Sequence, residues 1–136
     1  MTKEEWTRVE QALTGTSGVA KLLVDGRDIV FQRQLVGNNR LGIMMFIDGS
    51  FSWKWCINIF PEQKYLKRQE KFLYSTKTRA EFKKLSKRDK NYLAKDHAFN
   101  ADKKIVSYSP IWNSGIEIRR HYQKTFSSIE LVETVG

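Results

Sequence analysis

The first fifteen residues have the apolar spacing of an amphipathic helix. Apolar side chains recur at helical intervals from Trp6 to Leu13, with polar and charged residues between them. Thr2 and Glu5 stand in the T-x-x-E spacing of a capping box, in which a hydroxyl and a carboxylate satisfy two backbone donors at the start of a helix. We therefore expect a first helix over about residues 3 to 13.

From residue 19 onward the apolar pattern changes to the period of two that strands show. Turn-forming residues divide it into four segments of strand length, residues 19–24, 28–36, 41–47 and 51–57. The dividing residues tolerate the positive φ angles of tight hairpins; they are Asp25-Gly26, Gly37-Asn38-Asn39 and Asp48-Gly49. Three consecutive hairpins predict an antiparallel meander of four strands, with one buried face covered by the first helix.

A basic segment follows the four predicted strands. Residues 64–95 hold twelve Lys and Arg against three Asp and Glu, a local net charge of +9 that equals the formal net charge of the whole chain. Its first eleven residues have a weak strand pattern, and Ser75 or Thr78 and then Ser86 are placed to begin two short helices with few apolar residues. We expect a basic helical insertion between residues 64 and 96, with a broad basic exterior.

The last third of the chain returns to mixed charge. Residues 104–109 have strand composition, and Ser114 with Glu117 gives another capping signal ahead of a helix that would bury Ile118 and Tyr122. A closing strand follows within SSIELVE. The expected fold is α+β: an antiparallel meander of four or more strands, N- and C-terminal helices packed on one face, and the basic helical insertion, all in one domain over residues 1–136.

The composition indicates the cellular compartment in which the protein works. Cys56 is the only cysteine, which excludes an intramolecular disulfide and fits a reducing compartment. The N-terminal residues lack the apolar core of a signal peptide, and no apolar run approaches the roughly 20 residues that span a bilayer. We expect a cytoplasmic protein that does not bind membranes.

The chain offers little for catalysis. Cys56, His97 and His121 lack the paired spacing of a metal site, so we expect no metal and no cofactor, and we interpret Cys56 as a buried thiol rather than a nucleophile. Phosphate-binding glycine loops and nucleophile elbows are missing from the sequence. We expect no enzyme activity, although the sequence leaves that question open.

One enzymatic alternative is a nuclease that depends on a divalent metal. Two Glu-x-Lys triplets occur at residues 62–64 and 81–83, and Asp48 is available as a further carboxylate. Such a site needs converging carboxylates to hold the metal, with a lysine near the scissile phosphate. Asp48 is also explained as the first residue of a turn.

The basic segment has a direct physical interpretation. Each phosphate that a Lys or Arg neutralises releases condensed counterions, so a dense basic strip gains affinity for a polyanion without sequence-specific geometry. The candidate binding residues are the cations of this segment: Lys67, Arg68, Lys71, Lys77, Lys83, Lys84, Lys87, Arg88 and Lys90. The alternative is an ordinary solvated surface, but such surfaces usually mix both charge signs.

The position and spacing of other residues in this segment add detail. Lys77, Lys84, Arg88 and Lys95 would lie near one face if its two helices were continuous. Its interleaved aromatic residues could stack on unpaired bases, but we expect them to anchor the segment because few other apolar residues are available; they are Tyr65, Phe72, Tyr74 and Tyr92.

Several stretches of the sequence are similar to sequences from one group of proteins. These are FLYSTKTRAEFKKL, YSPIWNS and IRRHYQKTFSSIELV, with a Val24-Asp25-Gly26 hairpin and an Asp48-Gly49 hairpin leading to Phe51 and Trp53. Over about residues 4 to 132 the chain resembles small, mostly uncharacterised proteins encoded by phages and prophages. The resemblance supplies no catalytic residues. It implies an inhibitor of host defence, including the anti-CRISPR type, acting in the host cytoplasm.

We therefore expect a non-enzymatic, phage-encoded binding protein whose basic segment docks on nucleic acid or on a host nucleoprotein complex, such as a CRISPR-Cas defence complex. Two alternatives stay open. One is an inhibitor that binds a protein surface mainly by shape and apolar contact, and the other is the divalent-metal nuclease.

Overall fold

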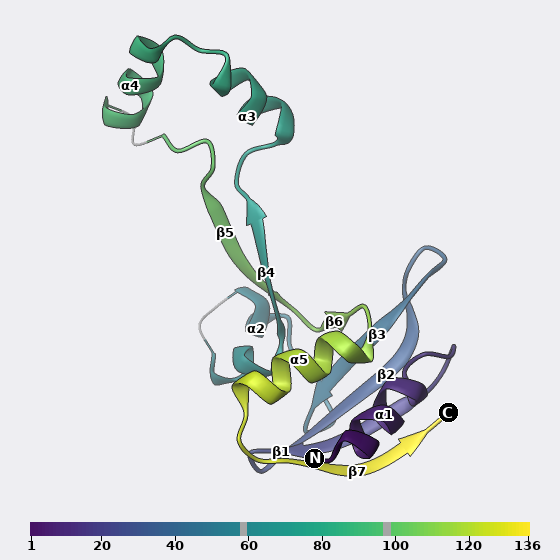
Figure 1. The fold of residues 1–136 in the computed structure, drawn as a ribbon. Helices are drawn as coiled ribbons and strands as arrows, with labels where there is room; N and C mark the ends of the chain where they lie inside the picture. Colours follow the sequence, from purple (N-terminus) through teal and green to yellow (C-terminus); the bar gives the residue numbers. More distant parts are fainter. Residues whose placement is uncertain (58–59, 97–98) are drawn as a thin grey trace. The chain divides into compact units, whose positions relative to one another are not determined.

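The computed structural model describes residues 1–57, 60–96 and 99–136, and it confirms the expected α+β fold (Figure 1). The elements in chain order are α1 (Lys3–Ala12), β1 (Val19–Val24), β2 (Arg27–Gly37), β3 (Arg40–Ile47), α2 (Lys54–Ile57), the 3-10 helix η1 (Pro61–Tyr65), β4 (Lys67–Phe72), α3 (Thr76–Lys83), α4 (Lys87–Asp96), β5 (Lys104–Ser109), β6 (Ile111–Trp112), α5 (Gly115–Thr125) and β7 (Ile129–Val135). The chain forms two compact units: unit 1 is Met1–Arg68 with Tyr108–Gly136, and unit 2 is Gln69–Ser107.

Unit 1 is built on a five-stranded antiparallel sheet in the order β6-β3-β2-β1-β7. The first two predicted hairpins are confirmed. Asp25 and Gly26 have φ angles of 47° and 81° between β1 and β2, and Asn39 has a φ of 53° between β2 and β3. These left-handed conformations match the turn chemistry of Asp, Asn and Gly. Cross-strand partners include Ala20 with Phe31 and Phe31 with Met45.

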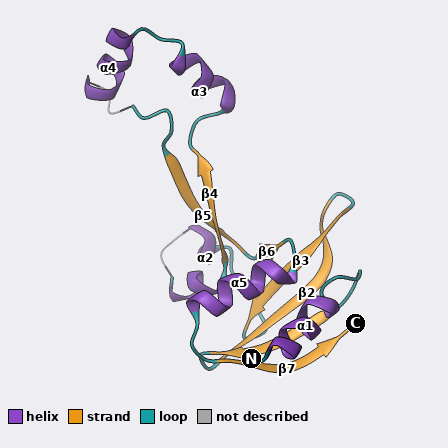
Figure 2. Cartoon of the chain, in the orientation of Figure 1, coloured by secondary structure: helices purple, strands orange, loops and turns teal. Residues whose placement is uncertain are grey.

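Two helices cover one face of this sheet, as predicted (Figure 2). α1 begins with the predicted capping box, in which Thr2 accepts from the Glu5 amide and the Glu5 side chain accepts from the Thr2 amide. α5 is capped by Ser114 and buries Ile118 and Tyr122 completely. Every second residue of the central strands points toward these helices and packs against them. One continuous apolar core therefore holds unit 1 together.

The predicted fourth strand of the meander is wrong. Asp48 and Gly49 adopt the expected turn, with φ angles of 51° and 84°, but only Ile47 and Ser50 form a bridge beyond it. The residues that follow form a turn and the short helix α2 instead. The physical reason lies in the sheet: the edge of β3 pairs with β6, so the position that this strand would occupy is already filled.

Unit 2 contains α3, α4 and most of the two-stranded ribbon of β4 and β5. Ser75 accepts from the Thr78 amide at the start of α3, and Ser86 accepts from the Asp89 amide at the start of α4. Its apolar centre is small, with Phe99 packed against the rings of Tyr74 and Phe82. Among the described residues of unit 2, only Ala101 is fully buried.

The two helices of unit 2 are separate, because Lys84, Leu85 and Ser86 lie between them. The single cationic face that required a continuous helix over residues 77–95 is therefore not formed in that way. Phe82 faces the aromatic centre, and most Lys and Arg side chains of both helices are exposed. None of the helices in the described part of the chain combines the length and apolar character that crossing a bilayer requires.

Candidate functional site

Seven of the nine predicted binding cations lie in unit 2, and we call them the unit 2 cations. They are Lys71 in β4, Lys77 and Lys83 in α3, Lys84 at its C-cap, and Lys87, Arg88 and Lys90 in α4. All are exposed except Lys90, which is half-buried. Within the described residues they form no ion pair and no side-chain hydrogen bond.

The electrostatic balance of unit 2 is positive as a whole. Its 39 residues contain eleven Lys and Arg against five Asp and Glu, a formal net charge of +6. Unit 1 contains thirteen basic and ten acidic residues, a net charge of +3. The excess charge thus resides mainly in the smaller unit, where clustered cations of one sign raise the local positive potential.

Arg79 is a cation of unit 2 with a different role. Its guanidinium lies 3.4 Å from the centre of the Phe72 ring, and its Nε is 3.8 Å from an Oδ atom of Asp102. Only 19% of its side chain is exposed. Cation–π stacking and charge pairing of this kind hold a fold together, so we assign Arg79 to the structure of unit 2 and not to its binding surface.

The aromatic residues of the basic segment mostly anchor it, as the sequence predicts. Tyr65 is 2% exposed and stacks on Phe126, and Tyr74 packs on Phe99. Phe72 is 40% exposed, but Arg79 covers one side of its ring. Tyr65 and Tyr74 therefore anchor the segment, whereas Tyr92 in α4 is 54% exposed.

Lys67 and Arg68, the remaining two predicted cations, belong to unit 1. The Lys67 ammonium is 3.2 Å from the Glu117 carboxylate, and only 19% of its side chain is exposed. Its charge is thus already paired. Arg68 is exposed and lines a cleft of about 340 Å³ beside α5, which we call the α5 cleft. The residues around the α5 cleft are Lys67, Arg68, Trp112, Glu117, Arg120, His121 and Lys124.

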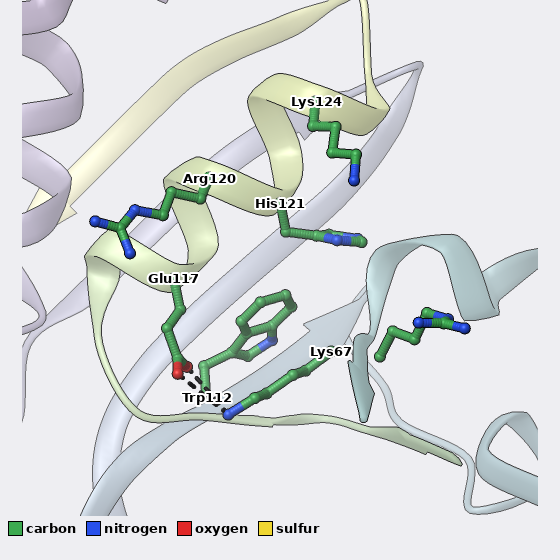
Figure 3. Close-up of a pocket in the computed structure, with 7 residues that line it drawn as sticks. Lys67, Trp112, Glu117, Arg120, His121 and Lys124 are labelled. Atoms are coloured by element: carbon green, nitrogen blue, oxygen red, sulfur yellow. Dashed lines mark hydrogen bonds and ion pairs between the residues drawn. The ribbon is translucent and has the colours of Figure 1, made fainter. Parts of the chain in front are cut away.

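Figure 3 shows the Lys67 ammonium meeting the Glu117 carboxylate beside Trp112, with His121 and Lys124 projecting from α5. Glu117 also accepts from the backbone amide of Asn113 at 3.0 Å. Burial raises the pKa of Glu117, but the hydrogen bonds from Asn113 and Lys67 outweigh it, so the pKa lies below its ordinary value. At neutral pH Glu117 is therefore ionised, and its negative charge is balanced by Lys67 and by the Asn113 amide.

His121 is held in one orientation. Its Nε2 lies 2.8 Å from the carbonyl oxygen of Lys64, and because a carbonyl only accepts, this nitrogen carries the proton. The imidazole also packs 5.5 Å from the Trp112 ring, measured between centroids. Trp112 is 1% exposed, and its indole N–H donates to the sulfur of Met45 at 3.3 Å. The cleft therefore has a rigid aromatic wall.

The sequence predicts the helix that carries Arg120 and Lys124, but nothing in it joins this helix to Lys67 and Arg68. The contact between His121 and Lys64 joins residues 57 apart in the chain, and that between Lys67 and Glu117 joins residues 50 apart. Only the packing of η1 and β4 beside α5 brings them together.

Two carboxylates of the nuclease alternative, Asp48 and Glu62, are engaged by the same protein cation, whereas Glu81 lies in α3 of unit 2. Arg27 Nε donates to Asp48 at 2.6 Å, and another nitrogen of the same guanidinium is 3.7 Å from Glu62. Asp48 also accepts from the Asp28 amide, and this bond, followed by the Arg27 bond, lowers its pKa. The guanidinium thus supplies the positive charge that a metal would bring. The described residues contain no group of three or more potential metal ligands.

Cys56 does not form a reactive pair in the described part of the chain. It is half-buried, and burial raises the pKa of its thiol, which keeps the sulfur protonated. His121 is held by Lys64, and His97 lies outside the described residues.

Comparison with known proteins gives no match: no family model, no curated protein and no solved structure is significantly similar to this chain.

Proposed function

We propose that this chain is a non-enzymatic binding protein whose unit 2 docks on nucleic acid or on a host nucleoprotein complex. One observation carries the proposal: six of the seven unit 2 cations are exposed, and none of the seven has an acidic partner within the described residues, in a unit of net charge +6. A purely solubilising surface usually intersperses both signs.

Counterion release explains why this surface favours a polyanion. Each phosphate contact from Lys or Arg frees condensed ions, and the resulting affinity depends on charge density more than on base identity. Because Tyr74 packs on Phe99 and Arg79 covers one side of the Phe72 ring, we expect mainly contacts to phosphate and to backbone shape, with little sequence preference. The resemblance to phage proteins adds an anti-CRISPR role, with a host-defence nucleoprotein as the target.

A second candidate is supported by a separate surface. Trp53 and Ile57 are 65% and 81% exposed in and beside α2 of unit 1. Large apolar side chains at the surface are typical of protein interfaces, where aromatic residues contribute most of the binding energy. An inhibitor that binds a protein surface by shape and apolar contact would use this side of unit 1.

A matched pair of quadruple variants tests the first proposal. One variant replaces Lys83, Lys84, Lys87 and Arg88 by Gln, and the control replaces Lys3, Arg8, Lys21 and Lys54 of unit 1 by Gln, so both lose four positive charges. The measurement is the affinity for a fluorescent 20-mer duplex as a function of salt concentration. For four lost phosphate contacts, the slope of log K against log salt should become shallower by about 3.6.

The control variant should keep most of the original slope, and both variants should melt within a few degrees of the original chain because all these side chains are exposed. Equal binding by the two variants would show that the unit 2 cations are not the binding surface. A shallow salt response in the unaltered chain, with binding lost on Trp53→Ala, would support the protein-surface candidate. Plating of phage on a CRISPR-protected strain that expresses each variant tests the anti-CRISPR role.

A further inference from the structure

The helix α4 of unit 2 has one half-buried side and one exposed side. Lys90 and Leu93 are half-buried, and the Leu93 carbonyl oxygen accepts at 2.9 Å from the amide of Phe99, whose ring lies at the apolar centre of the unit. Side chains three or four positions apart share one face of a helix. The exposed side carries four such residues, which we call the outer face of α4: Arg88, Asn91, Tyr92 and Lys95.

Three side chains of the outer face have no protein partner among the described residues. Arg88, Asn91 and Lys95 make no ion pair and no side-chain hydrogen bond there. The acidic residue of the first turn, Asp89, is placed about 100° around the helix from Arg88. The outer face therefore contains two cations and no acid, a net charge of +2, and its side chains offer several hydrogen-bond donors.

Further cations stand at the N-terminal end of α4. Lys83 ends α3, Lys84 is the C-cap of that helix, and Lys87 is the first residue of α4. All three are exposed, and Figure 1 shows α3 and α4 running in different directions from the short connection between them. Lys87 and Lys95 are about 12 Å apart along the helix axis, so positive charge is present at both ends of α4.

These dimensions match the major groove of B-form DNA. That groove is about 12 Å wide and about 8.5 Å deep, and it admits an α-helix, whose diameter with side chains is about 10 to 12 Å. Arg and Lys donate to guanine edges in this groove, and Asn pairs with adenine edges. The major groove of an RNA duplex is deep and narrow, and side chains cannot read it.

We propose that unit 2 binds double-stranded DNA by placing the outer face of α4 in the major groove. This inference rests on the proposed function and narrows its ligand to B-form DNA. Arg88 and Asn91 contact base edges, and the lysines at the start of the helix contact phosphates at the rim of the groove. Phosphate contacts still supply most of the affinity, because the charge of unit 2 is spread well beyond the outer face.

Binding of the full chain to three nucleic acids of one sequence tests the proposal. They are a DNA duplex, the RNA duplex and the single DNA strand, each labelled and titrated at the same salt concentration. The DNA duplex should bind about tenfold or more tightly than the RNA duplex, since only its major groove admits α4. Equal or tighter binding of the RNA duplex or the single strand would overturn this inference and leave nucleic-acid binding intact. Failure of all three to bind would refute nucleic acid as the ligand of unit 2.

A variant of unchanged net charge separates the outer face from the phosphate contacts. Arg88→Lys with Asn91→Ala loses the guanidinium fork and the amide but keeps every positive charge. It should weaken DNA-duplex binding about fivefold or more, and should leave both its salt slope and RNA-duplex binding unchanged. The matched control, Arg8→Lys with Asn38→Ala, changes exposed residues of unit 1 and should bind as the unaltered chain does. Unchanged DNA affinity in the α4 variant, with an unchanged far-ultraviolet circular dichroism spectrum, would refute base contact by this face.

Chemical probing identifies the groove that is occupied. Dimethyl sulfate methylates guanine N7, which faces the major groove, and adenine N3, which faces the minor groove. With saturating protein, N7 should be protected and N3 should react as in free DNA. An N7 that stays fully reactive, with or without protection of N3, would overturn the proposal.

Discussion

Removal of unit 2 most directly tests whether the stable core of the protein lies in unit 1 alone. The variant replaces Gln69–Ser107 by a six-residue Gly-Ser linker, which has a typical end-to-end distance of about 13 Å. Neighbouring strands lie about 4.8 Å apart, so this linker spans the paired strands that it joins. We expect unit 1 to fold without unit 2.

The expected magnitude follows from where the core lies. Every fully buried apolar residue in the described structure belongs to unit 1 except Ala101, so the excision removes almost no buried area from the main core. Shortening the connection from 39 to six residues lowers the loop-closure cost by at most about 1.7 kcal/mol. The free energy of unfolding of unit 1 should therefore stay within about 2 kcal/mol of its value in the full chain.

The tryptophans allow the free energy of unfolding of unit 1 to be measured. All four, Trp6, Trp53, Trp55 and Trp112, lie in unit 1, so their fluorescence during urea unfolding reports that unit alone. Trp6→Ala, which removes a side chain that is 1% exposed, serves as the control and should cost about 3 to 5 kcal/mol in either chain. A shortened chain without a cooperative fluorescence transition would refute the assignment of the core to unit 1.

Three further substitutions test individual contacts. Glu117→Gln should lower stability by about 1 kcal/mol or less above pH 5; because the folded-state pKa is depressed, the loss should shrink in urea titrations as the pH falls below the ordinary value of 4.5. Tyr122→Phe removes the buried hydroxyl that donates to a carbonyl of η1 at 2.7 Å, and should cost about 1 to 3 kcal/mol in urea unfolding; Tyr108→Phe, whose hydroxyl has no hydrogen bond within the described residues, should cost far less. Gly18→Ala would place a methyl carbon 1.5 Å from a carbonyl oxygen in the last turn of α1 and should lower the melting temperature by 10 °C or more, about 2 to 3 kcal/mol, whereas Gly15→Ala has open space and should change it little.

Local signals predicted most of the fold because they act over a few residues. Asp25 and Gly26 specify a tight turn wherever they occur, and the Ser114 cap begins α5 by a contact three residues away. The failed fourth strand has a different cause. Phe51 and Trp53 alternate as strand residues do, but their place beside β3 is taken by residues 111–112, and a competition over that separation leaves no trace in the local pattern.

The same distinction applies to the candidate sites. The unit 2 cations were found because charge density is a property of composition, and most of them turned out to be exposed. Lys67 looked identical to them in the sequence, yet its ion pair with Glu117 crosses 50 residues. The α5 cleft was missed for the same reason, since its walls come from opposite ends of the chain's second half and meet only through tertiary packing.

The small aromatic centre of unit 2 has a consequence for how the unit responds to its ionic surroundings. Three rings, one buried alanine and the contacts of Arg79 with Phe72 and Asp102 oppose the mutual repulsion of a surface with net charge +6. A region with so few buried contacts opens at low free-energy cost. Added electrolyte screens that repulsion, and a bound polyanion removes it. Amide exchange in α3 and α4 should thus slow whenever their charge is neutralised, so that engagement of a partner and rigidity of these helices rise together.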